Sequence, residues 1–146
     1  MRVAAQRGLI LVTKPVAQSM EVQGAAAALA NTVDALWLPT NPQLVTKELF
    51  SYLLEFAAEW KLPLFGFLDS FTEADALASM SPDYRAQGER AGEVAAEALA
   101  CGGKVTPGLL FTRSALTVNL RTAKELGVKP PALWARRSRL PARAPG

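Results

Sequence analysis

The sequence of 146 residues predicts an α/β domain with a mainly parallel sheet and helices on both faces. Short apolar runs alternate with longer stretches of helical periodicity, and the connections between them are short. One run, residues 33–38, is apolar on both faces apart from Asp34, as expected for a parallel strand that is covered on both sides. The length allows one domain with a core of its own, but not two lobes.

The N-terminal half is expected to hold, in order, a strand over residues 8–13, a helix over 20–29, a strand over 33–38 and a helix over 42–60. Ser19 can cap the first of these helices. Asn41 and Pro42 are a favoured pair for the N-cap and the first position of the second helix. The second helix has an apolar stripe at spacings of three and four, made of Val45, Leu49, Leu53, Phe56 and Trp60. Trp37 lies inside a predicted strand, so we expect it in the core.

The C-terminal half is expected to hold strands over residues 64–67, 77–80 and 116–120 and helices from residue 70, over 84–100 and over 122–126. Ser70 and Glu73 form a capping-box pattern at the start of the first helix. Asp83 precedes the longest helix, and two glycines at 102 and 103 follow it, which is typical of a helix start and a helix end. Residues 1–135 are thus expected to form one α/β ligand-binding domain, with a flexible basic tail over 136–146.

Composition excludes several classes of site. The chain has no histidine, which removes Ser-His-Asp and Cys-His catalysis and histidine-ligated metal sites. Cys101 is the one cysteine, so no internal disulfide and no cysteine-rich metal site can form. The dinucleotide, phosphate-loop and nucleophile-elbow motifs are missing. We therefore expect no catalytic residues, no metal and no cofactor.

The net charge of +3 comes from the end of the chain. Four arginines lie in the last eleven residues, and without them the net charge is −1. A basic run of this kind can contact nucleic acid or anionic lipid, but a solvated, frayed C-terminus is the interpretation we favour. We expect no nucleic-acid partner.

Polar side chains follow three of the predicted strands, where ligands bind in open parallel sheets. The candidate ligand-binding residues are Pro39, Thr40, Asn41, Leu68, Asp69, Ser70, Ser81 and Asp83. The backbone N–H groups of a helix that starts after Asn41 would suit a carboxylate, and Asp69 or Asp83 could pair with an ammonium group. Together these groups suit a zwitterion such as an amino acid. The alternative for Asn41, Ser70 and Asp83 is a purely structural role as helix caps.

Two aromatic residues near these strand ends could likewise have either a ligand-binding or a structural role. Phe67 and Phe71 could line an aromatic pocket for the ligand, although packing in the core is the interpretation we favour for both.

Four stretches carry a resemblance to a known family: VDALWLPTN at 33–41, LPLFGF at 62–67, GERAGEVAA at 88–96 and VNLRTAKELG at 118–127. In this order and spacing, over about residues 8–135, they resemble ABC transporter substrate-binding proteins of the tryptophan/tyrosine-type group. The resemblance implies a type I periplasmic-binding-protein fold, in which two Rossmann-like lobes close on a small molecule such as an aromatic amino acid. Such proteins deliver the ligand to an ABC permease and catalyse nothing. They work in the periplasm or at the outer face of the cytoplasmic membrane.

The chain departs from that family in length and in its start. It has about half the usual length and corresponds to the C-terminal portion, a single Rossmann-like lobe with half a cleft. No export signal is apparent, so a cytoplasmic location is expected if the chain is complete. The helix over 84–100 would pack on the lobe that is missing, which leaves a face at Gly88 and Gly92 without a partner.

Three hypotheses follow from this comparison. The first is a partial solute-binding component of an ABC-type uptake transporter. The alternative is an interaction or sensor domain derived from such a receptor, which forms a homodimer through the face at Gly88 and Gly92. A small cytoplasmic α/β enzyme is the least favoured hypothesis, because the residues for it are missing.

Overall fold

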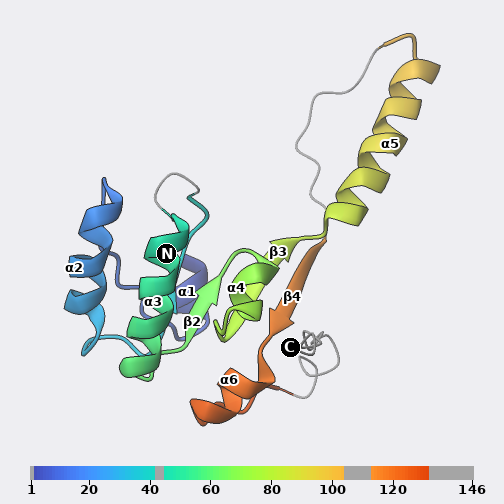
Figure 1. Ribbon diagram of the computed structural model, residues 1–146. Helices are drawn as coiled ribbons and strands as arrows, with labels where there is room; N and C mark the ends of the chain where they lie inside the picture. The colour runs from blue at the N-terminus through green and yellow to red at the C-terminus, as the bar shows by residue number, and fades with distance from the viewer. Residues whose placement is uncertain (1, 42–44, 104–112, 132–146) are drawn as a thin grey trace. The chain divides into compact units, whose positions relative to one another are not determined.

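The computed structural model describes residues 2–41, 45–103 and 113–131. The chain divides into two compact units, Met1–Leu64 and Phe65–Gly146, and each is described by itself (Figure 1). The hydrogen-bonded order of the four strands is β1-β2-β3-β4, and the chain is therefore an α/β protein, as the sequence predicts. In the described ranges, no helix combines the length and the apolar character needed to cross a membrane.

The first unit contains α1 (Arg2–Gln6), α2 (Ser19–Leu29), β1 (Leu36–Trp37) and α3 (Lys47–Glu59). Helix α2 packs against α3. The predicted apolar stripe of α3 is confirmed at Leu49, Leu53 and Phe56, which are all buried. It is wrong at its two ends, because Val45 lies before the helix and Trp60, the C-cap, is exposed. The backbone N–H of Leu36 donates to the carbonyl of Pro63 at 2.8 Å, which ties β1 to the segment that leads into β2.

The second unit contains the rest of the elements, with β2 (Leu64–Gly66) beginning at the last residue of the first unit. They are α4 (Asp69–Glu73), β3 (Ala78–Pro82), α5 (Tyr84–Ala100), β4 (Ser114–Val118) and α6 (Leu120–Glu125). Strands β2 and β3 are parallel, with Phe65 opposite Ala78, whereas β3 and β4 are antiparallel, with Ser79 opposite Thr117. The buried centre of this unit is Leu77, Ala78, Val118 and Ala123.

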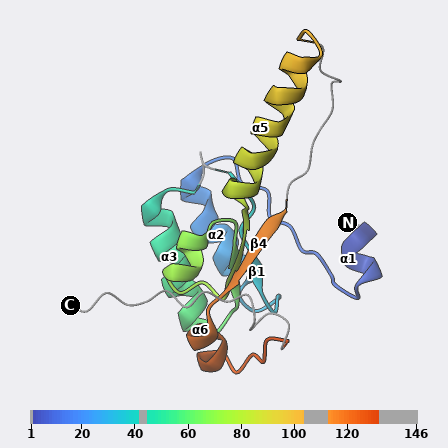
Figure 2. The same ribbon diagram turned by 90° about the vertical axis from the view of Figure 1, so that its right-hand side faces the viewer.

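The longest helix matches its prediction. Helix α5 spans Tyr84–Ala100, and the side chain of Asp83 accepts a hydrogen bond from the backbone N–H of Ala86 at 3.0 Å. Its end has Gly102 and Gly103 at positive φ, where glycine is favoured. None of its residues is buried, and Figure 2 shows it extending away from β4 of the same unit.

Several predictions about the first unit are wrong. Residues 8–13 form no strand: no strand of the described chain pairs with them, and Ile10 is 93% exposed. Helix α2 begins at Ser19 itself, so Ser19 is not its cap, and β1 is only two residues long. Since neighbouring strand residues point to opposite faces, Leu36 is buried while Trp37 is 67% exposed rather than in the core.

The start of α3 also differs from the prediction. Asn41 does not cap this helix, and Pro42 lies outside the described residues. The cap is Thr46, whose hydroxyl accepts from the backbone N–H of Leu49 at 3.3 Å. A threonine hydroxyl at this position satisfies one of the free backbone N–H groups of the first turn.

Two predictions in the second unit need correction. Helix α4 begins at Asp69, so Ser70 is its second residue and not its cap. Strand β4 ends at Val118, because the side chain of Asn119 accepts from the backbone N–H groups of Arg121 and Thr122 and starts α6 there. The strands predicted near residues 64–67 and 77–80 are confirmed as β2 and β3 with shifted ends.

Candidate functional site

The eight predicted site residues are divided between the two units. Pro39, Thr40 and Asn41 follow β1 in the first unit, where Thr40 is exposed and Asn41 is half-buried. The backbone carbonyl of Asn41 accepts a hydrogen bond from the N–H of Val45 at 3.0 Å. Leu68, Asp69, Ser70, Ser81 and Asp83 belong to the second unit.

Asp69 is the centre of a hydrogen-bonded group in the second unit. Its Oδ1 accepts from the hydroxyls of Ser81 at 2.8 Å, Thr117 at 2.8 Å and Ser79 at 3.4 Å. The hydroxyl of Thr72 donates in turn to Ser79 at 2.7 Å. We call these five residues the Asp69 cluster. The cluster brings together Asp69 and Ser81, two predicted site residues from different strand ends.

The sheet geometry explains why these hydroxyls meet. Ser79 and Ser81 alternate along β3 and therefore share one face, and the register places Thr117 of β4 opposite Ser79. Helix α4 begins at Asp69 soon after β2 and packs on β3 and β4, which carries the carboxylate to the same face.

The residues of the Asp69 cluster differ in how far they are exposed to solvent. Thr72 and Ser79 are each 1% exposed and Ser81 is 3% exposed, whereas Asp69 is exposed. Buried hydroxyls must find partners, so Ser79 and Ser81 hold the carboxylate from the buried side, and Thr72 holds Ser79 in turn.

The remaining predicted residues of the second unit have simpler roles. Asp83 caps α5 through the backbone N–H of Ala86, so the structural alternative for this residue is confirmed as at least one of its roles. Ser70 is exposed on the first turn of α4, and its backbone carbonyl accepts from Ala74. Leu68 is half-buried before the helix. The rings of Phe67 and Phe71 pack edge-to-face, 4.9 Å apart, and Phe71 is buried.

Sequence reasoning missed three members of the cluster: Thr72, Ser79 and Thr117. The alternation of serine at positions 79 and 81 on a predicted strand is a signal that could have pointed to Ser79. Thr117 could not be found in this way, because its place depends on the register of β3 with β4.

A second polar group anchors α6. The Nδ2 of Asn119 donates to the backbone carbonyl of Thr72 at 3.1 Å and to the carboxylate of Asp75 at 3.2 Å. Arg121 also pairs with Asp75, and that hydrogen bond and the negative charge raise the pKa of the Arg121 guanidinium. Both partners are more than half exposed, so this ion pair adds little stability.

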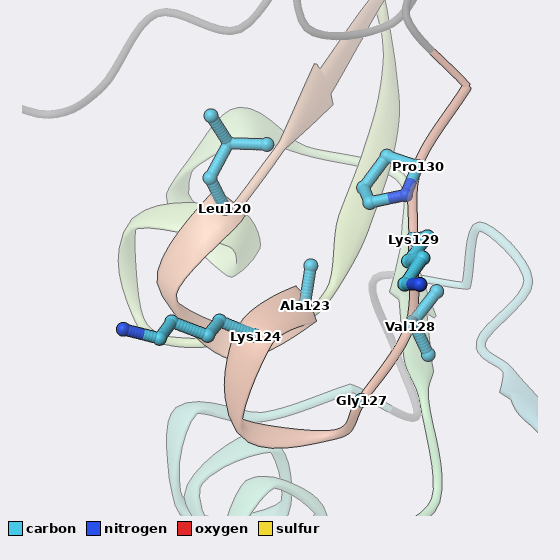
Figure 3. Close-up of a pocket in the computed structure, with 7 residues that line it drawn as sticks. All are labelled: Leu120, Ala123, Lys124, Gly127, Val128, Lys129 and Pro130. Atoms are coloured by element: carbon cyan, nitrogen blue, oxygen red, sulfur yellow. The ribbon is translucent and has the colours of Figure 1, made fainter.

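A shallow apolar hollow of about 500 Å³ lies beside α6 (Figure 3). Its lining comes from the helix and the segment that follows it: Leu120, Ala123, Lys124, Gly127, Val128, Lys129 and Pro130. It contains none of the eight predicted site residues and no member of the Asp69 cluster. The hollow and the polar candidate site are therefore separate features.

Within residues 2–41, 45–103 and 113–131, no three acidic or cysteine side chains come together as metal ligands. The Asp69 cluster offers one carboxylate and several hydroxyls, which can bind a polar ligand by hydrogen bonds and charge. It lacks the paired base and nucleophile of covalent catalysis.

The comparisons with known proteins agree with a binding role. The family model described as ABC transporter substrate binding protein matches residues 1–134. A comparison with curated proteins found no match.

Three solved structures are similar to this chain. An ABC domain from Streptococcus pneumoniae in complex with L-Trp has a TM-score of 0.73 at 22% identity, over 94% of this chain and 46% of its own. A conserved domain protein from Vibrio cholerae has a TM-score of 0.65 at 27% identity, over 92% and 45% of the two chains. A ligand-free, open substrate-binding protein with adhesive properties from Clostridium difficile has a TM-score of 0.65 at 25% identity, over 90% and 44%.

The chain spans slightly less than half the length of each of these structures. The first likeness, at 22% identity, shows the fold alone. The match to the family model covers nearly the whole chain, and the assignment to a family rests on this match. This chain belongs to the family of ABC transporter substrate-binding proteins.

Proposed function

We propose that the chain forms one lobe of the solute-binding component of an ABC-type uptake transporter. It holds a small molecule such as an amino acid at the loops after its strands, and it catalyses no reaction. The residues that would face the ligand are Pro39, Thr40, Asn41, Leu68, Asp69, Ser70, Ser81 and Asp83. Its partners would be this ligand and an ABC permease, at the outer face of the cytoplasmic membrane or in the periplasm.

The hydrogen bond between Asp69 and Ser81, at 2.8 Å, is the observation that carries this proposal. Asp69 follows the carboxyl end of β2, and Ser81 lies near the carboxyl end of β3, which is parallel to β2. Ligands of open α/β sheets bind beyond such strand ends. Two neighbouring strand ends here share one polar cluster with a solvent-facing carboxylate.

An aromatic amino acid is the ligand class we favour. The support is the L-Trp complex of the similar ABC domain, together with family membership. We infer no cofactor for this binding role.

The test of the assigned loops is the double variant Thr40→Ala, Asn41→Ala, with L-tryptophan as the probe in an NMR titration. We expect the affinity to fall about tenfold or more, because two polar contacts are lost, each about 1 kcal/mol. The midpoint of chemical unfolding should stay within experimental error, since Thr40 is exposed and Asn41 is only half-buried. Thr13→Ala, also at an exposed position, is the matched control. Unchanged affinity in the double variant would rule out this loop.

Self-association is a second candidate function, favoured by one observation. Helix α5 has 17 residues and none is buried, and a Cβ added at Gly88 or Gly92 would meet nothing within 4 Å. A homodimer would cover this face and would sediment near twice 15.6 kDa. The double variant Gly88→Leu, Gly92→Leu fits the monomer and should weaken such a dimer. A wild-type chain that stays monomeric at high micromolar concentration would refute this candidate.

A further inference from the structure

We infer that Oδ2 of Asp69 is the acceptor for a primary ammonium group of the ligand, and that Thr117, Ser79 and Ser81 are positioning residues for it. This inference rests on the proposed function and narrows its ligand class to molecules that carry an ammonium group. It also chooses between Asp69 and Asp83, which the sequence alone leaves open.

The first step is the asymmetry of the Asp69 carboxylate. All three hydroxyl donors converge on Oδ1, at 2.8, 2.8 and 3.4 Å. Its partner Oδ2 accepts no hydrogen bond from any residue of the described ranges. Among the described residues, Oδ1 therefore has three donors and Oδ2 has none, which leaves Oδ2 available to a ligand.

The second step concerns charge. No lysine or arginine in the described part of the chain forms an ion pair with Asp69. Its neighbours in the cluster are neutral hydroxyls, which donate hydrogen bonds without cancelling the negative charge. An ammonium group supplies both the missing donor and the missing charge, and such charge-assisted hydrogen bonds are about twice as strong as neutral ones.

The third step is the direction of the hydroxyl chain. Thr72 donates to Ser79, and Ser79 donates to Asp69, so each proton points towards the carboxylate. Thr72 and Ser79 are each 1% exposed, and they have no room for alternative partners from solvent. This buried chain fixes the carboxylate orientation before a ligand arrives, which lowers the entropy cost of binding.

Asp83 is the weaker candidate for the same ligand group. One of its oxygens accepts from the backbone N–H of Ala86 at 3.0 Å, and this bond begins α5. No hydroxyl of the described residues donates to it, so its orientation is set by the helix rather than by a polar cluster.

The experiment compares three probes that share an indole ring: L-tryptophan, tryptamine, which lacks the carboxylate, and indole-3-propionate, which lacks the ammonium group. Each is titrated to about 10 mM by NMR, enough to detect a Kd of about 1 mM. We expect the wild-type chain to bind L-tryptophan and tryptamine more tightly than indole-3-propionate. Asp69→Asn should weaken the first two about tenfold or more, because the charge that holds their ammonium group is removed. It should not weaken indole-3-propionate, which has no ammonium group and carries a carboxylate that Asp69 repels.

The positioning role is tested with Thr117→Val, which keeps the side-chain shape and removes one hydroxyl. It should reduce the preference for tryptamine over indole-3-propionate, and Thr117→Ser should restore that preference. A purely structural role would change stability without moving this ratio. Asp75→Asn is the matched control, because Asp75 is also an exposed aspartate of this unit but pairs with Arg121.

The outcomes separate this inference from the function on which it rests. Binding of L-tryptophan and indole-3-propionate with equal affinity, unaffected by Asp69→Asn, would overturn the inference and leave the proposed function standing. The absence of shifts with all three probes would overturn both for this ligand class.

Discussion

The Nδ2 of Asn119 donates a hydrogen bond of 3.1 Å to the backbone carbonyl of Thr72, which lies 47 positions earlier in the chain. Asn119 is 7% exposed, and its Oδ1 accepts from the backbone N–H groups of Arg121 and Thr122. One side chain thus joins α4 to the start of α6.

We expect Asn119→Ala to lower the free energy of unfolding by about 2–3 kcal/mol, through the lost cap and a buried carbonyl left without its donor. Asn119→Asp keeps the cap acceptor but places a second carboxylate beside Asp75, so it should also destabilise the chain. Urea unfolding followed by circular dichroism measures both. Lys124→Ala, at an exposed position of the same helix, is the control. An Asn119→Asp variant as stable as wild type would show that the cap alone matters.

The second prediction concerns Gly66 at the end of β2. A Cβ at this position would lie 2.2 Å from Cδ2 and 2.9 Å from Cβ of Phe71, which is 8% exposed. Gly66→Ala should therefore cost about 1–3 kcal/mol of unfolding free energy by overpacking. Adding Phe71→Leu should recover part of that loss relative to Phe71→Leu alone.

Gly24→Ala is the matched control for this substitution. Gly24 lies inside α2, and a Cβ there meets nothing within 4 Å, so alanine should stabilise the helix by about 0.5–1 kcal/mol. If both substitutions changed the free energy of unfolding equally, the contact with Phe71 would not be the cause of a loss of stability at Gly66.

Helix and strand positions could be predicted from the sequence where the signals for them are local. Helix α5 is predicted to the residue because both of its signals, Asp83 and the glycine pair, are local. Residues 8–13 have the composition of a strand, but a strand also needs a neighbour to pair with, and composition cannot supply one. The start of α3 is predicted after Asn41, but Thr46, five positions later, is the cap, so a favourable cap residue alone does not locate a helix start.

The same distinction applies to the candidate site. Asp69 and Ser81 could be predicted to meet, because the carboxyl ends of neighbouring parallel strands share one edge. Thr117 could not, because its place depends on an antiparallel register between β3 and β4, segments that are far apart in the sequence. Long-range register is set by the whole sheet rather than by either strand.

The third prediction is a pH dependence at the start of α3. The pKa of the Glu48 carboxyl is lowered from its ordinary value of 4.5, first by a hydrogen bond from its own backbone and then by the Thr46 hydroxyl. The charged form is favoured in the folded chain, so its contribution to stability is present above pH 4.5 and is lost as the pH falls through the folded-state pKa.

The measurement is the thermal midpoint of wild type and Glu48→Gln from neutral pH to below pH 4. The wild type should be the more stable at neutral pH, and the difference should shrink at acid pH. Glu59→Gln, at the other end of the same helix, is the control for the loss of a glutamate outside the first turn. A difference between wild type and Glu48→Gln that is constant with pH would exclude this role of the charge.

The fourth prediction concerns the cap of α5. No residue of this helix is buried, and its exposed ion pairs, such as Arg85 with Glu89 at 3.1 Å, are worth little each. An uncovered helix of 17 residues is close to the limit of stability in water, so the cap at Asp83 should matter more here than in a buried helix. Asp83→Ala should cost about 1 kcal/mol, whereas Asp83→Ser keeps an acceptor for the N–H of Ala86.

Native-state hydrogen exchange of the α5 amides is the measurement for this prediction. Asp83→Ala should raise exchange several-fold along α5 while protection in β3 and β4 stays the same, because α5 can unfold without exposing a core. Asp83→Ser should exchange like wild type. If α5 amides of the wild type exchanged only by global unfolding, the helix would have to be covered in solution. In that case the face at Gly88 and Gly92 would be the surface to examine.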